Sequence, residues 1–202
     1  MPGLKPYLWN AVQRVFDAPE FKRDLYRSVL RTPGRLLDFG CATGHIADAF
    51  QDFEYYGLDL DPQSIDTAKS RFAGHPRMHF LAADLHKRPF EANFFDEIMF
   101  AGTVHHLTDE LLVSLLKELH FCLKSGGRIH ILDPVLQDGD SALQRSMRRL
   151  DRGRYPRSVP QFKALVSSVH LFEIGPVGIH APRGALIRDC DFAHMELTKR
   201  PY

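Results

Sequence analysis

The residues best suited to chemistry gather in one short stretch, residues 35–50, which reads RLLDFGCATGHIADAF. Asp38 follows a hydrophobic run, and Gly40, Ala42 and Gly44 come after it at alternate positions. Apolar residues at helical spacing begin after Gly44. These features predict a buried strand, a turn of small residues and the N-terminus of a helix. Such a turn exposes backbone N–H groups, so the stretch predicts a site for a nucleotide-like ligand.

Two classes of ligand compete for this turn. A dinucleotide fingerprint, G-x-G-x-x-G, would require small residues at positions 40, 42 and 45, and His45 is too bulky for the third. The carboxylate of Asp38 would also face the pyrophosphate of a dinucleotide. The spacing Asp38-x-Gly40-x-Ala42-x-Gly44 instead suits a ligand with an ammonium group and a ribose that touch the turn. It favours a sulfonium nucleoside with an amino-acid tail.

Similar residues follow three further segments that have the hydrophobic character of strands. The segments span residues 55–60, 78–82 and 94–100, and a fifth strand is expected over residues 128–132. The residues at their ends are Asp59, Asp84 and the pair Ala101 and Gly102. Because ligands bind outside the carboxyl ends of parallel strands, these residues and Asp38 are expected to form one nucleoside site. The other interpretation is that Asp and Gly are simply common in turns.

Helical patterns alternate with these strands and predict a mostly parallel sheet covered on both faces. One helix is expected after the start signal Asp61-Pro62. Another is expected after Thr108, with its buried face formed by Leu111, Leu112, Leu115, Leu116 and Leu119. Residues 137–150 and 159–169 have helical patterns, and the extended segments 170–179 and 185–197 predict an antiparallel hairpin. Residues 4–31 predict two helices that divide at Pro19 and form either a packing layer or a lid.

The composition is that of one ordinary globular domain. The 202 residues are 44% hydrophobic and carry a net charge of +1, so there is no overall basic excess that would favour nucleic acid. Cys41, Cys122 and Cys190 form no C-x-x-C pair, which predicts reduced thiols and no metal site. The sequence has no apolar run of about 20 residues and no signal-peptide core at its start, so a cytoplasmic location is expected.

The motifs over residues 35–134 resemble those of the class I S-adenosylmethionine-dependent methyltransferases of the small-molecule type, which includes quinone-biosynthesis enzymes. The resemblance implies a Rossmann-like three-layer α/β/α sandwich. Its seven-stranded sheet would be mostly parallel and would end in a C-terminal antiparallel hairpin. It also implies that S-adenosylmethionine is the cofactor. Ala42 departs from the family pattern, which commonly has glycine at this position.

The resemblance further assigns cofactor-binding residues to each strand end. Those expected to line the methionine part are Asp38, Gly40, Cys41 and Gly44. Asp59 would bind the ribose hydroxyls, Leu60 would contact the adenine, and Asp84 and Leu85 would meet the adenine edge. Ala101 and Gly102 would border the methyl-donor end.

Two histidines follow the fourth strand, at the rim where the methyl group should emerge. His105 is the candidate catalytic residue, because an imidazole has an unperturbed pKa suited to a general base. His106 is a candidate substrate-binding residue, and Asp133 at the end of the fifth strand is a weaker rim candidate. The alternative is that one or both histidines cap the next helix or pack beside the cofactor.

The segment 144–158 contains six arginines and one acid. Arginine suits carboxylate or phosphate, so Arg152, Arg154 and Tyr155 are candidates for binding an anionic or lipid-like acceptor. The alternative is a solvated charged face. The expected partner is therefore a small molecule, with contact to a membrane surface left open and no nucleic acid.

The predicted organisation is a single domain over residues 1–202. Residues 1–34 would form an N-terminal helical lid, residues 35–134 the cofactor-binding core, and residues 135–202 the acceptor-side helices and closing hairpin. The expected function is methyl transfer from S-adenosylmethionine to a small-molecule or lipid-like acceptor. The alternatives are a regulatory protein that binds S-adenosylmethionine without catalysis, and an NAD(P)-dependent oxidoreductase.

Overall fold

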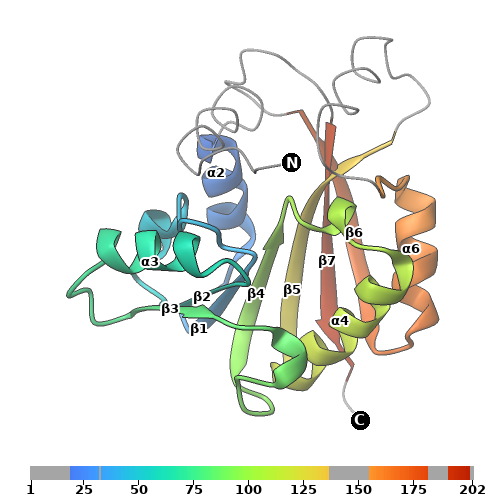
Figure 1. Cartoon of the computed structure of the whole chain (residues 1–202). Helices are drawn as coiled ribbons and strands as arrows, with labels where there is room; N and C mark the ends of the chain where they lie inside the picture. Colours follow the sequence, from blue (N-terminus) through green and yellow to red (C-terminus); the bar gives the residue numbers. More distant parts are fainter. Residues whose placement is uncertain (1–18, 32, 137–154, 182–190, 201–202) are drawn as a thin grey trace, which may run out of the picture.

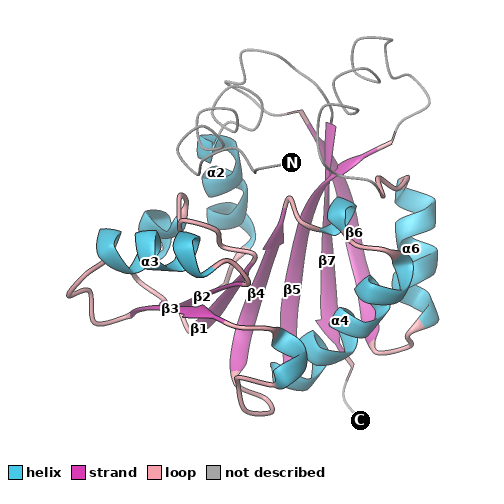
Figure 2. Ribbon diagram, in the orientation of Figure 1, coloured by secondary structure: helices cyan, strands magenta, loops and turns pink. Residues whose placement is uncertain are grey.

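The computed structural model describes residues 19–31, 33–136, 155–181 and 191–200 (Figure 1). These residues form one sheet of seven strands in the order β3-β2-β1-β4-β5-β7-β6 (Figure 2). The strands are β1 (Arg35–Phe39), β2 (Glu54–Asp59), β3 (Met78–Ala82), β4 (Phe95–Ala101), β5 (Leu123–Val135), β6 (Phe172–His180) and β7 (Asp191–Lys199).

The pairing of the strands is mostly parallel. β3, β2, β1, β4 and β5 pair in parallel, whereas β7 lies antiparallel between β5 and β6. The predicted seven-stranded sheet with its C-terminal antiparallel hairpin is therefore confirmed. The chain leaves β1 for β2 on one side and returns to β4 on the other, so a switch point lies at the carboxyl end of β1. Ligands of open α/β sheets bind at such a point.

Helices cover both faces of the sheet and complete the predicted three layers (Figure 1). They are α2 (Pro19–Val29), α3 (Pro62–Arg71), α4 (Asp109–Cys122) and α6 (Val159–Ser168). Successive side chains of β1 point to opposite faces, so Leu36 packs in the cluster of α2 and α3, and Leu37 in that of α4 and α6. Each face therefore has its own apolar core.

The start signals of the helices are confirmed by their caps. The Asp61 side chain accepts hydrogen bonds from the backbone N–H groups of Gln63 and Ser64, both at 3.2 Å, and Pro62 is the first residue of α3. Thr108 caps α4 in the same way through Leu111 N. The helix predicted over residues 137–150, the first of the two helices predicted over residues 4–31, and Cys190 lie outside the described residues.

Two expectations about local structure are wrong. The segment after the glycine turn contains only a four-residue 3₁₀ helix, η1 (Ala47–Phe50), and no α-helix N-terminus. Leu111 is 42% exposed and does not belong to the buried face of α4, which Leu112, Leu115, Leu116 and Leu119 form. Position 111 lies in the first turn of α4, where its side chain lines a cleft at the carboxyl ends of the strands and is not covered by the core.

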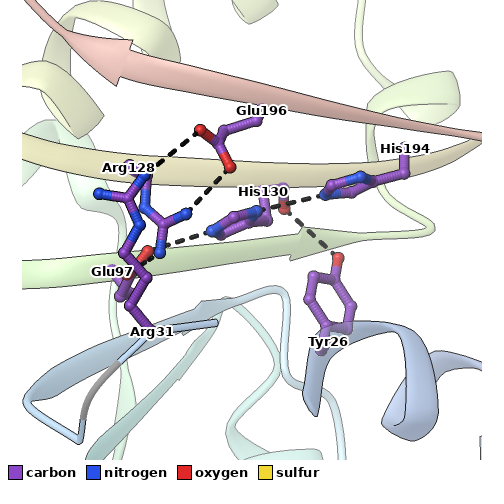
Figure 3. A network of polar contacts seen from close by, with 7 residues as sticks. All are labelled: Tyr26, Arg31, Glu97, Arg128, His130, His194 and Glu196. Atoms are coloured by element: carbon purple, nitrogen blue, oxygen red, sulfur yellow. Dashed lines mark hydrogen bonds and ion pairs between the residues drawn. The ribbon is translucent and has the colours of Figure 1, made fainter. Parts of the chain in front are cut away.

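A buried polar network joins β4, β5 and β7 on the face that α2 covers (Figure 3). The Arg128 guanidinium donates to Glu97 and to Glu196. The His130 imidazole lies between Glu97 Oε2 at 3.1 Å and His194 Nε2 at 3.2 Å. Burial lowers the pKa of His194 to about 4, so its imidazole is neutral at neutral pH.

Candidate cofactor and acceptor site

The glycine turn after β1 requires left-handed backbone at three alternate positions. The φ angles of Gly40, Ala42 and Gly44 are +80°, +47° and +66°. A Cβ on Gly40 would lie 2.7 Å from Thr103 Oγ1, so glycine is required there by both conformation and space. Ala42 adopts the left-handed region without being glycine, which costs about 1–2 kcal/mol.

The carboxylate of Asp59 fixes this turn to the end of β2. Its Oδ2 accepts a hydrogen bond from Ala42 N at 2.9 Å, and its Oδ1 accepts one from Asp61 N at 2.9 Å. Each carboxylate oxygen can accept more than one hydrogen bond. Asp59 is therefore oriented by the backbone and keeps the capacity to accept two hydroxyl groups of a ribose.

A cleft of about 260 Å³ opens beside this turn at the carboxyl ends of the strands. Of the predicted cofactor residues, it is lined by Gly40, Asp59, Leu60, Asp84 and Leu85. The lining residues that sequence reasoning missed are Phe39, Leu58, Ala83, His86, Thr103, Leu107, Leu111 and Leu115. Leu60 is 73% exposed. The lining is mostly apolar, and its two carboxylates are Asp59 and Asp84. Apolar side chains suit a base and a carboxylate suits the hydroxyl groups of a ribose, so the lining matches a nucleoside.

Asp84 is held in place by its neighbour His86. The Asp84 side chain accepts from His86 N, and its Oδ1 lies 3.0 Å from His86 Nδ1. His86 Nε2 lies 2.9 Å from Ser114 Oγ of α4. The hydrogen bond from the His86 N–H, followed by that from its imidazole, lowers the pKa of Asp84. Asp84 therefore presents an acceptor at the edge of the cleft.

Asp38 and Cys41 lie deeper than the cleft lining. The carboxylate of Asp38 is buried and accepts a hydrogen bond from the Tyr55 hydroxyl. Burial raises the pKa of Asp38 to about 6, although Tyr55 and the positive charge of Lys22 oppose that rise. The Cys41 thiol is buried beside Gly57, and burial raises its pKa well above the usual value. Cys41 is therefore a neutral packing thiol behind the turn.

Lys22 is a buried cation that the sequence did not single out. It belongs to α2, is 3% exposed, and its Nζ would lie 3.2 Å from a Cβ on Gly102. Gly102 directly follows Ala101 at the end of β4 and has a φ of +60°. Its N–H donates to Leu132 O of β5. Lys22 and Tyr26 lie one helical turn apart, and both are buried. This i, i+4 spacing, which puts both side chains on one face of the helix, was the sequence feature that could have indicated a buried Lys22.

His45 lies at the end of the glycine turn, near the same cation. Burial and the charges of Lys22, Arg23 and Arg71 lower its pKa to about 3. Its Nδ1 has no hydrogen-bond partner. The region between the turn and α2 thus contains positive charge and a buried polar atom, which fit the polar tail of an amino acid.

His105 and Asp133 form a buried pair at the next strand end. The short helix η3 (Val104–His106) carries His105, whose Nδ1 lies 3.1 Å from Asp133 Oδ1 and 3.2 Å from Oδ2. Both side chains are less than 10% exposed. A carboxylate at Nδ1 selects the tautomer with its proton on that nitrogen, so Nε2 is the basic nitrogen. The pair can remove a proton.

The predicted acceptor-side residues are only partly within the described chain. The His106 ring lies beside that of His105, with 4.1 Å between the ring centroids and 41° between the ring planes, and His106 is exposed. Tyr155 is 41% exposed and its backbone N–H donates to His105 O at 2.9 Å. The structure therefore brings Tyr155 to the histidine turn, whereas Arg152 and Arg154 lie outside the described residues.

The part of the chain that the structure describes contains no cluster of three or more His, Cys, Asp or Glu side chains suited to a metal ion. It also contains no helix long and apolar enough to cross a membrane.

Comparison with known proteins gives one consistent picture. Residues 36–127 match the family model of a methyltransferase domain. The ubiquinone/menaquinone biosynthesis C-methyltransferase UbiE of Coxiella burnetii is 24% identical over 181 residues, which cover 82% of this chain and 71% of that protein. The 6-hydroxytryprostatin B O-methyltransferase of Aspergillus fumigatus is 29% identical over 144 residues, covering 65% of this chain and 41% of that protein.

A solved structure has the same fold. The phosphoethanolamine N-methyltransferase 2 of Haemonchus contortus, in complex with S-adenosylhomocysteine, superposes with a TM-score of 0.69 at 19% identity. The match covers 91% of this chain and 53% of that one. The fold is thus that of the Rossmann-like α/β proteins. Residues 36–127 thus form a methyltransferase domain, and the chain is an enzyme that methylates a small-molecule acceptor with S-adenosylmethionine as its cofactor.

Proposed function

We propose that the acceptor is a hydroxylated aromatic molecule whose methylation requires loss of a proton to His105. The observation that carries this proposal is the buried His105–Asp133 pair at the carboxyl edge of the sheet. The names of the two relatives support the acceptor class, since one acts in quinone biosynthesis and the other methylates a hydroxylated compound. A phenolic hydroxyl becomes a strong nucleophile, at oxygen or at a ring carbon, when it is deprotonated.

In the proposed cofactor site, different groups of this chain bind different parts of the cofactor. Asp38 takes the ammonium group and Lys22 the carboxylate of the methionine part. Asp59 accepts from the ribose hydroxyls, and Leu60 and Asp84 contact the adenine. The glycine turn at positions 40 and 44, with Cys41 behind it, leaves room for the tail, and Leu85, Ala101 and Gly102 complete the border. When bound, S-adenosylmethionine supplies a methyl group that is already activated on sulfur.

The chain's own residues then have positioning and proton-transfer roles. His105 Nε2 accepts the acceptor proton, and Asp133 stabilises the imidazolium that forms. His106 and Tyr155 contact the acceptor ring from the rim, and Arg152 and Arg154 bind an anionic substituent. Alignment of the two reactants supplies about 7–11 kcal/mol of the barrier reduction. A cytoplasmic location and contact with a membrane surface are part of the same proposal, since a quinone-like acceptor is apolar.

Transfer of a labelled methyl group tests the proposal. The acceptors are catechol, a naphthohydroquinone and a hydroxyindole, and His105→Gln is compared with the wild type. We expect His105→Gln to lose about 10²–10⁴-fold in kcat while it binds S-adenosylhomocysteine normally. His79→Gln, an exposed histidine paired with Glu54 on the far part of the sheet, should keep full activity.

Two results would contradict this proposal. Wild-type activity of His105→Gln would exclude the base role. Transfer to none of the three acceptors, together with cofactor binding, would exclude the acceptor class.

A further inference from the structure

The turn that carries both histidines is held by a segment about fifty residues away in the sequence. Arg157 Nη1 donates to Val104 O at 3.2 Å, and Arg157 Nη2 donates to Leu107 O at 2.7 Å. Tyr155 N donates to His105 O at 2.9 Å. Three carbonyl groups of the turn therefore accept hydrogen bonds from residues 155 and 157.

Arg157 is itself fixed from two other directions. Its Nε and Nη2 donate to Asp109 Oδ1, at 2.9 Å and 2.6 Å, at the start of α4. Its own carbonyl accepts from Leu136 N at 3.1 Å, next to an isolated parallel bridge with Val135 at the end of β5. The guanidinium is only 10% exposed. The Arg157 side chain thus joins η3 to the start of α4, and its backbone joins both to the strand that carries Asp133.

The contact between Asp133 and His105 depends on where that turn lies. Asp133 Oδ1 accepts from Val104 N at 3.0 Å and faces His105 Nδ1 at 3.1 Å. Val104 therefore has its N–H on Asp133 and its carbonyl on Arg157. A small shift of the turn away from Arg157 would lengthen the hydrogen bond of Val104 and the contact of the imidazole together.

We propose that Arg157 is a positioning residue, which holds the His105 imidazole on Asp133 in the tautomer that leaves Nε2 basic. The proposal deepens the proposed function and rests on it for the catalytic consequence. Lysine cannot replace the planar fork, because a single ammonium cannot reach two carbonyls and a carboxylate in these directions. The ion pair with Asp109 alone contributes little, since the Asp109 side chain is 64% exposed.

The test is nitrogen NMR of ¹⁵N-histidine-labelled protein with S-adenosylhomocysteine bound, in which His105→Gln assigns the His105 signals. We expect the wild type to show one tautomer, protonated at Nδ1. We expect Arg157→Lys to show a mixture of tautomers or broadened His105 signals, with S-adenosylhomocysteine affinity within about twofold of the wild type. In the transfer assay, kcat of Arg157→Lys should fall about 10–100-fold, as expected for a catalytic group misplaced by about 1 Å.

Two controls separate positioning from general stability. Arg88→Lys changes an arginine that also pairs through two nitrogens with a carboxylate, Glu118, and should leave the His105 signals unchanged. Asp109→Asn keeps the guanidinium on the carbonyls and should retain the single tautomer. Folding of each variant is checked by thermal unfolding.

The outcomes distinguish this proposal from the proposed function. Wild-type His105 signals in folded Arg157→Lys would overturn the positioning role, whatever the activity. Altered signals with full methyl transfer in both Arg157→Lys and His105→Gln would instead overturn the base role of His105. Loss of the wild-type tautomer in Arg88→Lys to the same extent would also overturn the specific role of Arg157.

Discussion

At the scale of single residues, the two side chains proposed to bind the cofactor's amino-acid tail, Asp38 and Lys22, are of opposite charge type. Asp38 is buried with Tyr55, and Lys22 approaches Gly102 from α2. Asp59 belongs to a different part of the site, because its carboxylate bridges the glycine turn and the end of β2. In the proposed site the tail and the nucleoside are bound by separate groups, which can be tested separately.

Two ligands that differ by the amino-acid tail separate these groups. Lys22→Gln should weaken binding of S-adenosylhomocysteine about tenfold or more, since the hydrogen bond is to a charged group, and should leave adenosine binding unchanged. Asp59→Asn should weaken both ligands, because both carry the ribose. Isothermal titration calorimetry measures the four affinities. Equal losses for the two ligands in Lys22→Gln would mean that Lys22 does not meet the tail.

At the scale of elements, the turn after β1 depends on the backbone conformation and on the space available at its glycines. Gly40 and Gly74 have nearly the same φ, +80° and +79°, but differ in space. A Cβ would meet Thr103 Oγ1 at 2.7 Å in the first case and nothing within 4 Å in the second. Substitutions at these two positions therefore separate the energetic cost of left-handed backbone from the cost of a steric clash.

Alanine substitutions measure this difference. Gly74→Ala should lower the free energy of unfolding by about 1–2 kcal/mol, the cost of left-handed backbone alone. Gly40→Ala should lower it by more, since the added methyl group also displaces Thr103, and the double variant Gly40→Ala/Thr103→Ala should recover part of the loss. Urea unfolding provides the values. An equal loss at both glycines would show that Thr103 does not restrict the turn.

At the scale of the whole molecule, buried titratable groups make stability depend on pH. Folding lowers the pKa of His194 to about 4 and that of His45 to about 3, so their contributions are complete above pH 6.5 and decline as the pH falls. Asp38 acts in the opposite direction, because its raised pKa of about 6 favours the protonated folded state at low pH. As the pH falls from 7 to 5, the stability lost at the two histidines exceeds the stability gained at the one aspartate.

We therefore expect the melting temperature to fall between pH 7 and pH 5. His194→Gln should reduce the slope, because this variant removes one group that must stay neutral, and Asp38→Asn should increase it. Differential scanning calorimetry across this range measures both slopes. A melting temperature that rises toward pH 5 would contradict the assignment of these histidines as buried neutral groups.

Much of the fold follows from local sequence patterns. Hydrophobic runs bounded by turn residues located β2, β3, β4 and β6 within about two residues of their observed positions. β5 begins at Leu123, five residues before the predicted start at 128, and the predicted start of β7 lies outside the described residues. Asp61-Pro62 and Thr108 located the starts of α3 and α4 because caps act within one helical turn. The prediction of a helix after the glycine turn was wrong, because Ile46, Ala47 and Phe50 have helical spacing but only Ala47–Phe50 form the short helix η1. All three side chains are buried in the same core cluster, so their spacing reflects burial and not a long helix.

The sequence by itself determined the type of ligand, because carboxylates and glycines at strand ends must converge when the strands are parallel. Only the tertiary structure could show that Lys22 reaches Gly102, that Asp133 lies against His105, and that Arg157 holds the histidine turn. Lys22 and Gly102 are eighty residues apart, and the arginine is about fifty from the turn it binds. Contacts between distant segments depend on the packing of whole elements, which no local pattern of residues specifies.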